Sequence, residues 1–357
     1  MKLEGFAGDR VFASGCRNIY AETDDLEFQQ RGRLPKVQLR QQSFQRFLQT
    51  GCYTKAALAR LFGSFPTVNI WPIAEDRLFA SRGRMLYRST DGAQTWTEIY
   101  QLPSSSGPMG VLPTGFAMEA ETILLGEYPL DESDQPRVME SQDGGTTWKT
   151  VFEPEARHVH AVTIDPYTGD RWITTGDGNE EAMIARLFDD GIDIVGSGSQ
   201  LWRAVDIAFT PDAVLWGMDC PYVENNRIVR LSRDEITKRD PTVKTVHVVG
   251  SPVYFAETVS IDGEHHVLFS TAIEPATTPK HTARVVHGTT ADGFKEWDTL
   301  VRYERASPPF GSFIDTNAYV FIAADSLRGV FVNPYNTATE NGSIQKIPLS
   351  CLRQHED

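Results

Sequence analysis

The sequence has few cysteines, no long hydrophobic run and a shortage of positive charge. Its four cysteines, Cys16, Cys52, Cys220 and Cys351, lie far apart without a CxxC pair. Such spacing favours neither a zinc ribbon nor a dense disulfide framework, so we expect four reduced thiols. No stretch approaches the roughly 18 unbroken apolar residues of a membrane helix, and the first residues lack the apolar core of a signal peptide. We therefore expect a cytoplasmic protein without a membrane partner.

The balance of charge excludes another class of partner. The 357 residues include 48 acidic and 34 basic ones, a formal net charge of -14. This excess repels the phosphates of nucleic acids, and no basic stripe is present to bind them. Motifs for a serine nucleophile (G-x-S-x-G) and for a glycine-rich phosphate loop are missing as well. The 40% hydrophobic and 23% charged content is that of an ordinary globular protein.

An internal repeat dominates the sequence. Residues 89–96 and 141–148 share the spacing S-x-D-G-x-x-T-W, and residues 290–297 keep its Asp, Gly and Trp. Weaker copies occur at residues 19–28, 187–194 and 232–234. Asp and Ser oxygens accept backbone N–H bonds in a turn, Gly adopts a positive φ, and Trp covers the neighbouring sheet edge. The repeat therefore predicts a series of hairpin turns rather than catalytic residues.

These octets resemble the Asp-box (BNR) repeats of the sialidase superfamily of β-propellers, in which the box joins the third and fourth strands of a blade. The resemblance implies an all-β fold of four-stranded antiparallel blades. A blade of this kind needs roughly 40 to 50 residues. The repeat's aspartates, Asp24, Asp91, Asp143, Asp189, Asp234 and Asp292, are 67, 52, 46, 45 and 58 residues apart, which is near that length after a long first step.

Counting these turns predicts a single propeller domain over residues 1–357, with seven blades and a seventh turn near residues 335–340. Six blades are the alternative. The first blade is expected to lack a strand that another part of the chain supplies, with residues 343–349 near the ring closure. Apolar residues at about 43–63 recur with helical period, which predicts a short helical insertion between the first and second blades. It would wall the propeller's funnel or decorate its solvent side.

The face opposite the repeat turns is where the superfamily resemblance places a functional site. Aligning the ends of the second strands puts a carboxylate on that face in five blades, namely Glu127, Asp177, Asp219, Glu274 and Asp325. Such a ring of acids can bind a divalent cation, hydrogen-bond sugar hydroxyls or act as acid and base. Acids at strand ends also serve simply to accept turn N–H groups.

Two histidines lie near this ring. His158 and His160 flank Val159 in a predicted strand, so both rings point to one face. They could share a divalent metal (Ca, Mn or Zn) with Asp177 or Asp219 as oxygen ligands. A neutral histidine beside a carboxylate is equally a general base for hydrolysis or for β-elimination from a uronic acid, and a structural role is the third possibility. The candidate catalytic residues are His158, His160, Asp177, Asp219 and Glu274.

Further side chains are predicted on the same face and suit a saccharide ligand. Sugar sites combine aromatic stacking with directional hydrogen bonds from carboxylates and arginine. Trp202 and Tyr254 would equally serve as packing between blades. The candidate substrate-binding residues are Glu127, Tyr128, Glu180, Trp202, Arg203, Tyr222, Glu224, Tyr254 and Asp325.

The resemblance implies a carbohydrate-active protein, either a glycoside hydrolase or a polysaccharide lyase. Sialidases of the superfamily carry an early [FY]-R-I-P motif, whereas the nearest string here, Gly-Arg-Leu-Pro at 32–35, follows a weak repeat instead of opening a blade. We therefore transfer no sialidase role to any residue. Two carboxylates about 5 to 10 Å apart would favour a hydrolase, and a histidine with Tyr or Arg would favour a lyase. A non-catalytic propeller that binds a glycan or a protein is the alternative.

Overall fold

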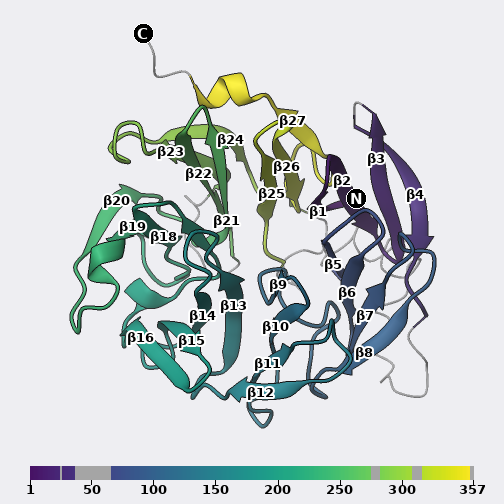
Figure 1. Cartoon of the computed structure of the whole chain (residues 1–357). Coiled ribbons are helices and arrows are strands. Elements are labelled where there is room, and N and C mark those ends of the chain that lie inside the picture. Colours follow the sequence, from purple (N-terminus) through teal and green to yellow (C-terminus); the bar gives the residue numbers. More distant parts are fainter. Residues whose placement is uncertain (25, 37–65, 275–281, 308–315, 354–357) are drawn as a thin grey trace.

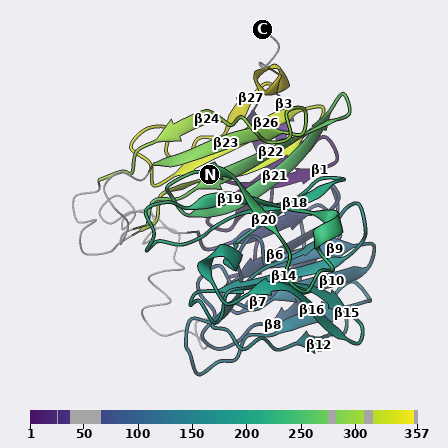
Figure 2. The ribbon, with the colours of Figure 1, turned by 90° about the vertical axis from the view of Figure 1, so that its left-hand side faces the viewer.

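Seven antiparallel sheets form the blades of a closed ring (Figure 1). The structure is a computed structural model that describes residues 1–24, 26–36, 66–274, 282–307 and 316–353. Seen from the edge, the strands run from one face of the ring to the other (Figure 2). The predicted all-β propeller is confirmed, and seven blades are correct where six were the alternative.

The first three blades are built from consecutive strands. Blade 1 contains β1 (Lys2–Ala7), β2 (Arg10–Gly15), β3 (Asn18–Asp24) and β4 (Glu27–Arg33). Blade 2 contains β5 (Asn69–Pro72), β6 (Leu78–Arg82), β7 (Met85–Ser89) and β8 (Thr97–Gln101). Blade 3 contains β9 (Phe116–Glu119), β10 (Thr122–Gly126), β11 (Val138–Ser141) and β12 (Lys149–Phe152).

The next three blades repeat this order. Blade 4 contains β13 (His158–Ile164), β14 (Arg171–Gly176), β15 (Met183–Phe188) and β16 (Gly191–Ser197). Blade 5 contains β17 (Ile207–Phe209), β18 (Ala213–Gly217), β19 (Arg227–Ser232) and β20 (Val243–Val248). Blade 6 contains β21 (Val253–Ile261), β22 (Glu264–Thr271), β23 (Ala283–Thr289) and β24 (Asp298–Tyr303).

The last blade is shorter. Blade 7 has three strands among the described residues, β25 (Tyr319–Asp325), β26 (Gly329–Tyr335) and β27 (Gln345–Ile347). Short 3-10 helices occur at η2 (Gln200–Trp202), η3 (Arg233–Glu235) and η4 (Leu349–Leu352). The helical insertion predicted at about 43–63 lies outside the described residues. No helix in the described ranges is both long and apolar enough to cross a membrane.

The repeat turns have the predicted hydrogen-bond chemistry. Asp143 accepts the backbone N–H groups of Thr146 and Thr147 at 2.9 and 2.8 Å, and Gly144 adopts a positive φ of 65°. The indole N–H of Trp148 donates a hydrogen bond of 2.9 Å to the carbonyl of Ile99 in the neighbouring blade. The octet therefore closes a hairpin locally and also ties adjacent blades together.

Two expectations about ring closure are wrong. Blade 1 has all four strands from its own segment, and the ring closes by side-by-side packing of β1 against β25. The backbone N–H of Leu3 donates to Asn333 Oδ1 at 3.0 Å, and Arg328 pairs with Glu22 at 2.6 Å. Residues 336–344 connect the second and third strands of blade 7, so no third-to-fourth turn exists there.

Glycines at the ends of second strands allow the blades to pack closely. A Cβ added at Gly126, the last residue of β10, would lie 2.5 Å from Val159 of the next blade. One added at Gly217, the last residue of β18, would lie 2.4 Å from Val253. Real Cβ contacts are never this short, so only glycine permits each inner strand to approach its neighbour here.

The prediction of four reduced cysteines is wrong for Cys16. This residue is disulfide-bonded, whereas Cys220 and Cys351 are free thiols. Wide spacing along the chain does not by itself prevent two thiols from meeting in a folded protein. Because disulfides persist mainly in oxidising compartments, Cys16 gives no support to a cytoplasmic location.

Candidate functional site

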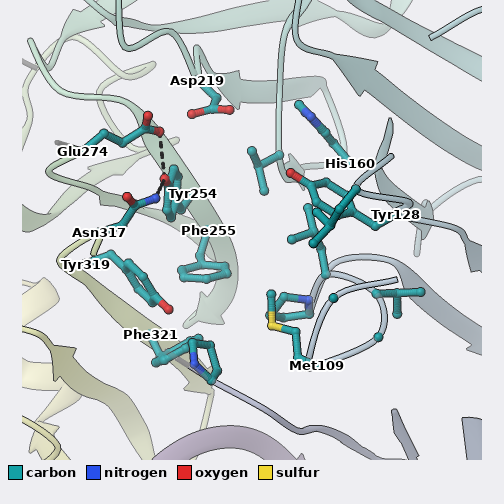
Figure 3. A pocket seen from close by; sticks show the side chains of 18 of the residues that line it. Met109, Tyr128, His160, Asp219, Tyr254, Phe255, Glu274, Asn317, Tyr319 and Phe321 are labelled. Atoms are coloured by element: carbon teal, nitrogen blue, oxygen red, sulfur yellow. Dashed lines mark hydrogen bonds between the residues drawn. The ribbon is translucent and has the colours of Figure 1, made fainter. Parts of the chain in front are cut away.

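A pocket of about 600 Å³ opens on the face opposite the repeat turns (Figure 3). Its polar residues come mostly from the ends of second strands and the starts of first strands, so blades 3 to 7 all contribute. Polar and charged lining residues include Tyr128, His160, Asp177, Arg203, Asp219, Tyr254, Glu274 and Asn317. The predicted funnel face therefore does carry a pocket lined by acids.

Asp177 is the centre of a charged cluster. Its Oδ1 lies 3.3 Å from His160 Nε2 and 3.1 Å from Arg203 Nη2, and its Oδ2 lies 3.5 Å from both His158 Nε2 and Arg157 Nη1. Burial raises the pKa of Asp177, but the hydrogen bond from His160 and the nearby positive charges outweigh it and hold the pKa below its usual range. The Asp177 side chain, 27% exposed, is thus an accessible carboxylate that stays ionised.

His158 contacts both Asp177 and the pocket residue Tyr128 without lining the pocket itself. The ring of Tyr128 stacks on His158 with centroids 3.9 Å apart and an interplanar angle of 13°. Burial lowers the pKa of His158 to about 4, so it is neutral near pH 7. The described part of the chain contains no group of three or more His, Cys, Asp or Glu arranged to hold a metal ion. The two histidines therefore have no matching set of carboxylate ligands there.

Arg203 joins two carboxylates inside the protein. Its Nε and Nη2 lie 3.2 and 3.1 Å from Asp219 Oδ2, and its Nη1 donates to the carbonyl of Asp177 at 2.9 Å. Asp219 is only 5% exposed, and its Oδ1 has no hydrogen-bond partner among the described residues. Burial raises the pKa of Asp219, with Arg203 acting in the opposite direction. An unpartnered buried oxygen beside a pocket is suited to accept a hydrogen bond from a ligand.

Glu274 completes the polar side of the pocket. The hydroxyl of Tyr254 donates to Glu274 Oε1 at 2.7 Å, and the amide of Asn317 donates to that hydroxyl at 2.5 Å. Burial and the negative charge of Asp219 raise the pKa of Glu274 to about 7. Glu274 therefore exchanges its proton near neutral pH, as a general acid must.

The remaining walls are aromatic and aliphatic. Phe255 of β21 stacks on Phe321 of β25 with centroids 5.2 Å apart, and Tyr254 lies 5.5 Å from Tyr319. Residues 107–113, in the connection between blades 2 and 3, contribute the facing side. Figure 3 shows Asp219, His160 and Glu274 at one side of the pocket and Met109 and Phe321 at the other.

The structure brings most of the predicted site residues together. Seven of them line the pocket, and His158 stacks directly beneath its Tyr128. These seven are Tyr128, His160, Asp177, Arg203, Asp219, Tyr254 and Glu274.

Five other predicted residues do not line the pocket. Glu127 is fully buried, pairs with Arg137 at 2.8 Å and accepts the hydroxyl of Tyr100, and Trp202 stacks on Trp216 between blades. The other three are exposed and are not part of its lining, namely Glu180, Tyr222 (80% exposed) and Glu224.

The placement of Asp325 is wrong. It ends β25, a first strand, so it lies in a hairpin on the face of the repeat turns. There it accepts the backbone N–H groups of Leu327 and Arg328 at 2.9 and 2.8 Å. The prediction required β25 to be a second strand, whereas it is the first strand of blade 7.

The lining residues that went unnoticed in the sequence include Asn317, Tyr319, Phe321 and Met109. Tyr319 and Phe321 alternate in β25, and this period of two would have placed both rings on one side of the strand. That signal becomes useful only once β25 is known to be an inner strand. Met109 lies in an irregular loop, where no periodicity indicates direction.

Comparison with known proteins shows the fold. No protein-family model matches the sequence, and no curated protein matches it. Among solved structures, an ancestral GH74 enzyme has a TM-score of 0.57 at 14% identity, covering 97% of this chain and 46% of that one. A GH74 xyloglucanase from Xanthomonas campestris has a TM-score of 0.47 at 15% identity (77% and 44%), and YCF48 bound to D1 peptide has 0.46 at 10% (79% and 86%). The chain spans less than half of the first enzyme, whose TM-score shows a shared fold and whose 14% identity shows nothing about activity.

Proposed function

We propose that this propeller is a carbohydrate-active enzyme that hydrolyses a glycosidic bond in the pocket on its funnel face. The observation that carries the proposal is the pair formed by Asp177 and Glu274. Both line one pocket, yet their surroundings push their pKa values in opposite directions. Glycosidases use two carboxyl groups in this way, one kept protonated and one kept ionised.

In the proposed reaction, Glu274 gives its proton to the glycosidic oxygen as the bond to the anomeric carbon breaks. Asp177 remains a carboxylate and stabilises the positive charge that develops on the sugar ring. Water then adds to the anomeric carbon and returns a proton to Glu274. Tyr254 and Asn317 hold Glu274 in position through their hydrogen bonds. Asp219 Oδ1 accepts a hydrogen bond from a sugar hydroxyl.

The charges of the pocket favour a hydrolase over a lyase. β-Elimination from a uronic acid needs a cation to neutralise the substrate carboxylate. Arg203 is already engaged by Asp177 and Asp219, and it is 8% exposed. The ionised Asp177 would repel the carboxylate of a uronic acid substrate.

The decisive experiment compares two variants on a panel of glycosides and oligosaccharides. Glu274→Gln removes the proton donor but keeps the shape of the side chain, so hydrolysis should fall by about 10² to 10⁴ while the melting temperature stays within a few degrees. Glu224→Gln, an exposed acid outside the pocket, is the matched control and should keep full activity.

Two results would contradict the proposal. Hydrolysis by Glu274→Gln at the rate of the unmodified protein would remove Glu274 from the mechanism. Saccharide binding without turnover by the unmodified protein would support the alternative of a non-catalytic glycan-binding propeller.

A further inference from the structure

The side of the pocket that faces the acids is apolar. Residues 107–113 line it, with Met109 and Leu112 partly exposed and flanked by proline and glycine, whereas Val111 packs into the core between blades 2 and 3. Phe321 of β25 lies on the same side of the pocket as Met109, away from Asp219 and Glu274 (Figure 3). We call residues 107–113 the loop wall.

The loop wall also turns its backbone acceptors away from the pocket. The carbonyl of Met109 accepts Ser81 Oγ at 2.5 Å, and that of Val111 accepts Asn69 Nδ2 at 2.7 Å. The carbonyl of Pro113 accepts the Trp71 indole at 2.7 Å. All three donors come from blade 2, so blade 2 fixes the backbone of the loop wall beside the pocket.

The neighbouring carbonyls are satisfied in the same way. Pro108 accepts the N–H of Gly83 at 2.7 Å, Gly107 that of Gly110 at 3.1 Å, and Leu112 that of Gly115 at 3.0 Å. A sugar ring against this wall would find few partners for its hydroxyl groups, and unpaired buried hydroxyls are costly. An alkyl or aryl group would lose no hydrogen bonds there and would gain by burial.

We propose that the pocket recognises a glycoside with an apolar aglycone. The sugar lies against Asp177, Asp219 and Glu274, and an alkyl or aryl leaving group lies against the loop wall and Phe321. This assignment rests on the proposed hydrolase function, since the aglycone leaves from the oxygen that Glu274 protonates.

The test uses matched n-alkyl glycosides, from methyl to hexyl, of glucose, galactose and mannose in both anomers. Each added methylene that enters the pocket should tighten binding about fourfold. Turnover is measured with the unmodified protein, and affinity by calorimetry with Glu274→Gln, in which chemistry does not consume the ligand.

Met109→Gln tests the wall directly, because it keeps the length of the side chain and adds a polar amide. It should weaken binding of the hexyl glycoside about tenfold or more and leave the methyl glycoside unchanged. Leu327→Gln, at a 90% exposed leucine on the opposite face, is the control and should change neither. If the amide impairs folding, Met109→Ala replaces it. By shortening the side chain, it should also weaken binding of the hexyl glycoside and leave the methyl glycoside unchanged.

The outcomes separate the two proposals. Equal KM and equal affinity for methyl and hexyl glycosides, with turnover of both, would overturn the aglycone assignment and leave the hydrolase standing. Tighter binding of the hexyl glycosides without turnover of any glycoside would support the apolar wall and overturn the hydrolase.

Discussion

Individual carboxyl groups in this propeller differ because their neighbours differ. Asp177 has two histidines and two arginines around it, whereas Glu274 has Asp219 and the hydroxyl of Tyr254. The first environment favours the ionised form and the second the protonated form. Identical functional groups are thereby prepared for opposite tasks in one pocket.

This difference predicts the pH dependence of hydrolysis. Glu274 must be protonated to donate, so kcat/KM should fall as the pH rises through about 7, the pKa of Glu274. Asp219→Asn removes a negative charge beside Glu274, which should lower that pKa and move the falling limb to lower pH. The measurement is a pH profile of kcat/KM with a single glycoside.

Asp325→Asn provides the matched control for the pH profile. Asp325 lies in a hairpin on the opposite face, so its substitution should leave the falling limb in place. An unchanged limb in Asp219→Asn would mean that Asp219 does not set the pKa of Glu274.

At the scale of single elements, the repeat turns are stabilised by short-range hydrogen bonds. In the turn between β11 and β12, Ser141 Oγ and Thr147 Oγ1 donate to Asp143 at 2.8 and 2.7 Å, besides the two backbone N–H groups. In the weak copy at η3, the side chain of Asp234 makes no such hydrogen bonds to the residues that the structure describes. The repeat therefore has strong and weak versions in one molecule.

The two versions make a matched pair for mutation. Asp143→Ala should lower the free energy of unfolding clearly more than Asp234→Ala does, because several donors in the turn lose their acceptor. Asp234→Ala should change it by less than about 0.5 kcal/mol. Urea denaturation of both variants checks this, and equal losses would show that the turn hydrogen bonds contribute nothing measurable.

At the scale of the whole molecule, inner strands from several blades line a cavity of about 140 Å³, which we call the channel. Lys2, Asn69, Asp206, Glu257 and Phe321 contribute to its lining. Burial raises the pKa of Asp206 to about 7, and burial together with the charge of Asp206 raises the pKa of Glu257 to about 8. The folded protein therefore holds protons in the channel that the unfolded chain has released.

This channel predicts how stability depends on pH. A carboxyl with a raised folded pKa stabilises the fold fully below its unfolded pKa of about 4, and that contribution is lost as the pH rises through the folded value. Between about pH 5 and 8, Glu257 alone should reduce the free energy of unfolding by about 1.4 kcal/mol per pH unit. Denaturation at several pH values tests this, and Glu257→Gln should flatten the slope.

A matched variant exists outside the channel. Glu264→Gln, at an exposed acid in blade 6, should leave the slope unchanged. A slope that is equally steep in Glu257→Gln would assign the pH dependence to other groups.

The sequence by itself determined the features that depend on neighbours along the chain. The S-x-D-G-x-x-T-W octet closes its turn through contacts three or four residues apart, so the motif alone predicted hairpins and, by counting, seven blades. The acids after the second strands of blades 4 to 6, Asp177, Asp219 and Glu274, followed from the same regular alternation of strands. His160, at the start of a first strand, was predicted on the same face and lines the same pocket.

Only the tertiary structure decided which of these side chains meet. Glu127 ends a second strand as Asp177 does, yet it faces Arg137 instead of the pocket, and Trp202 is covered by Trp216. Because β25 is the first of the three strands described in the last blade, Asp325 lies on the opposite face, and Tyr319 and Phe321 line the pocket. The orientation of the loop wall could not be predicted from a sequence period, because hydrogen-bond donors of blade 2 fix it. Local chemistry specifies turns and strands, but a pocket is made by residues far apart in sequence, whose contacts exist only when the ring is closed.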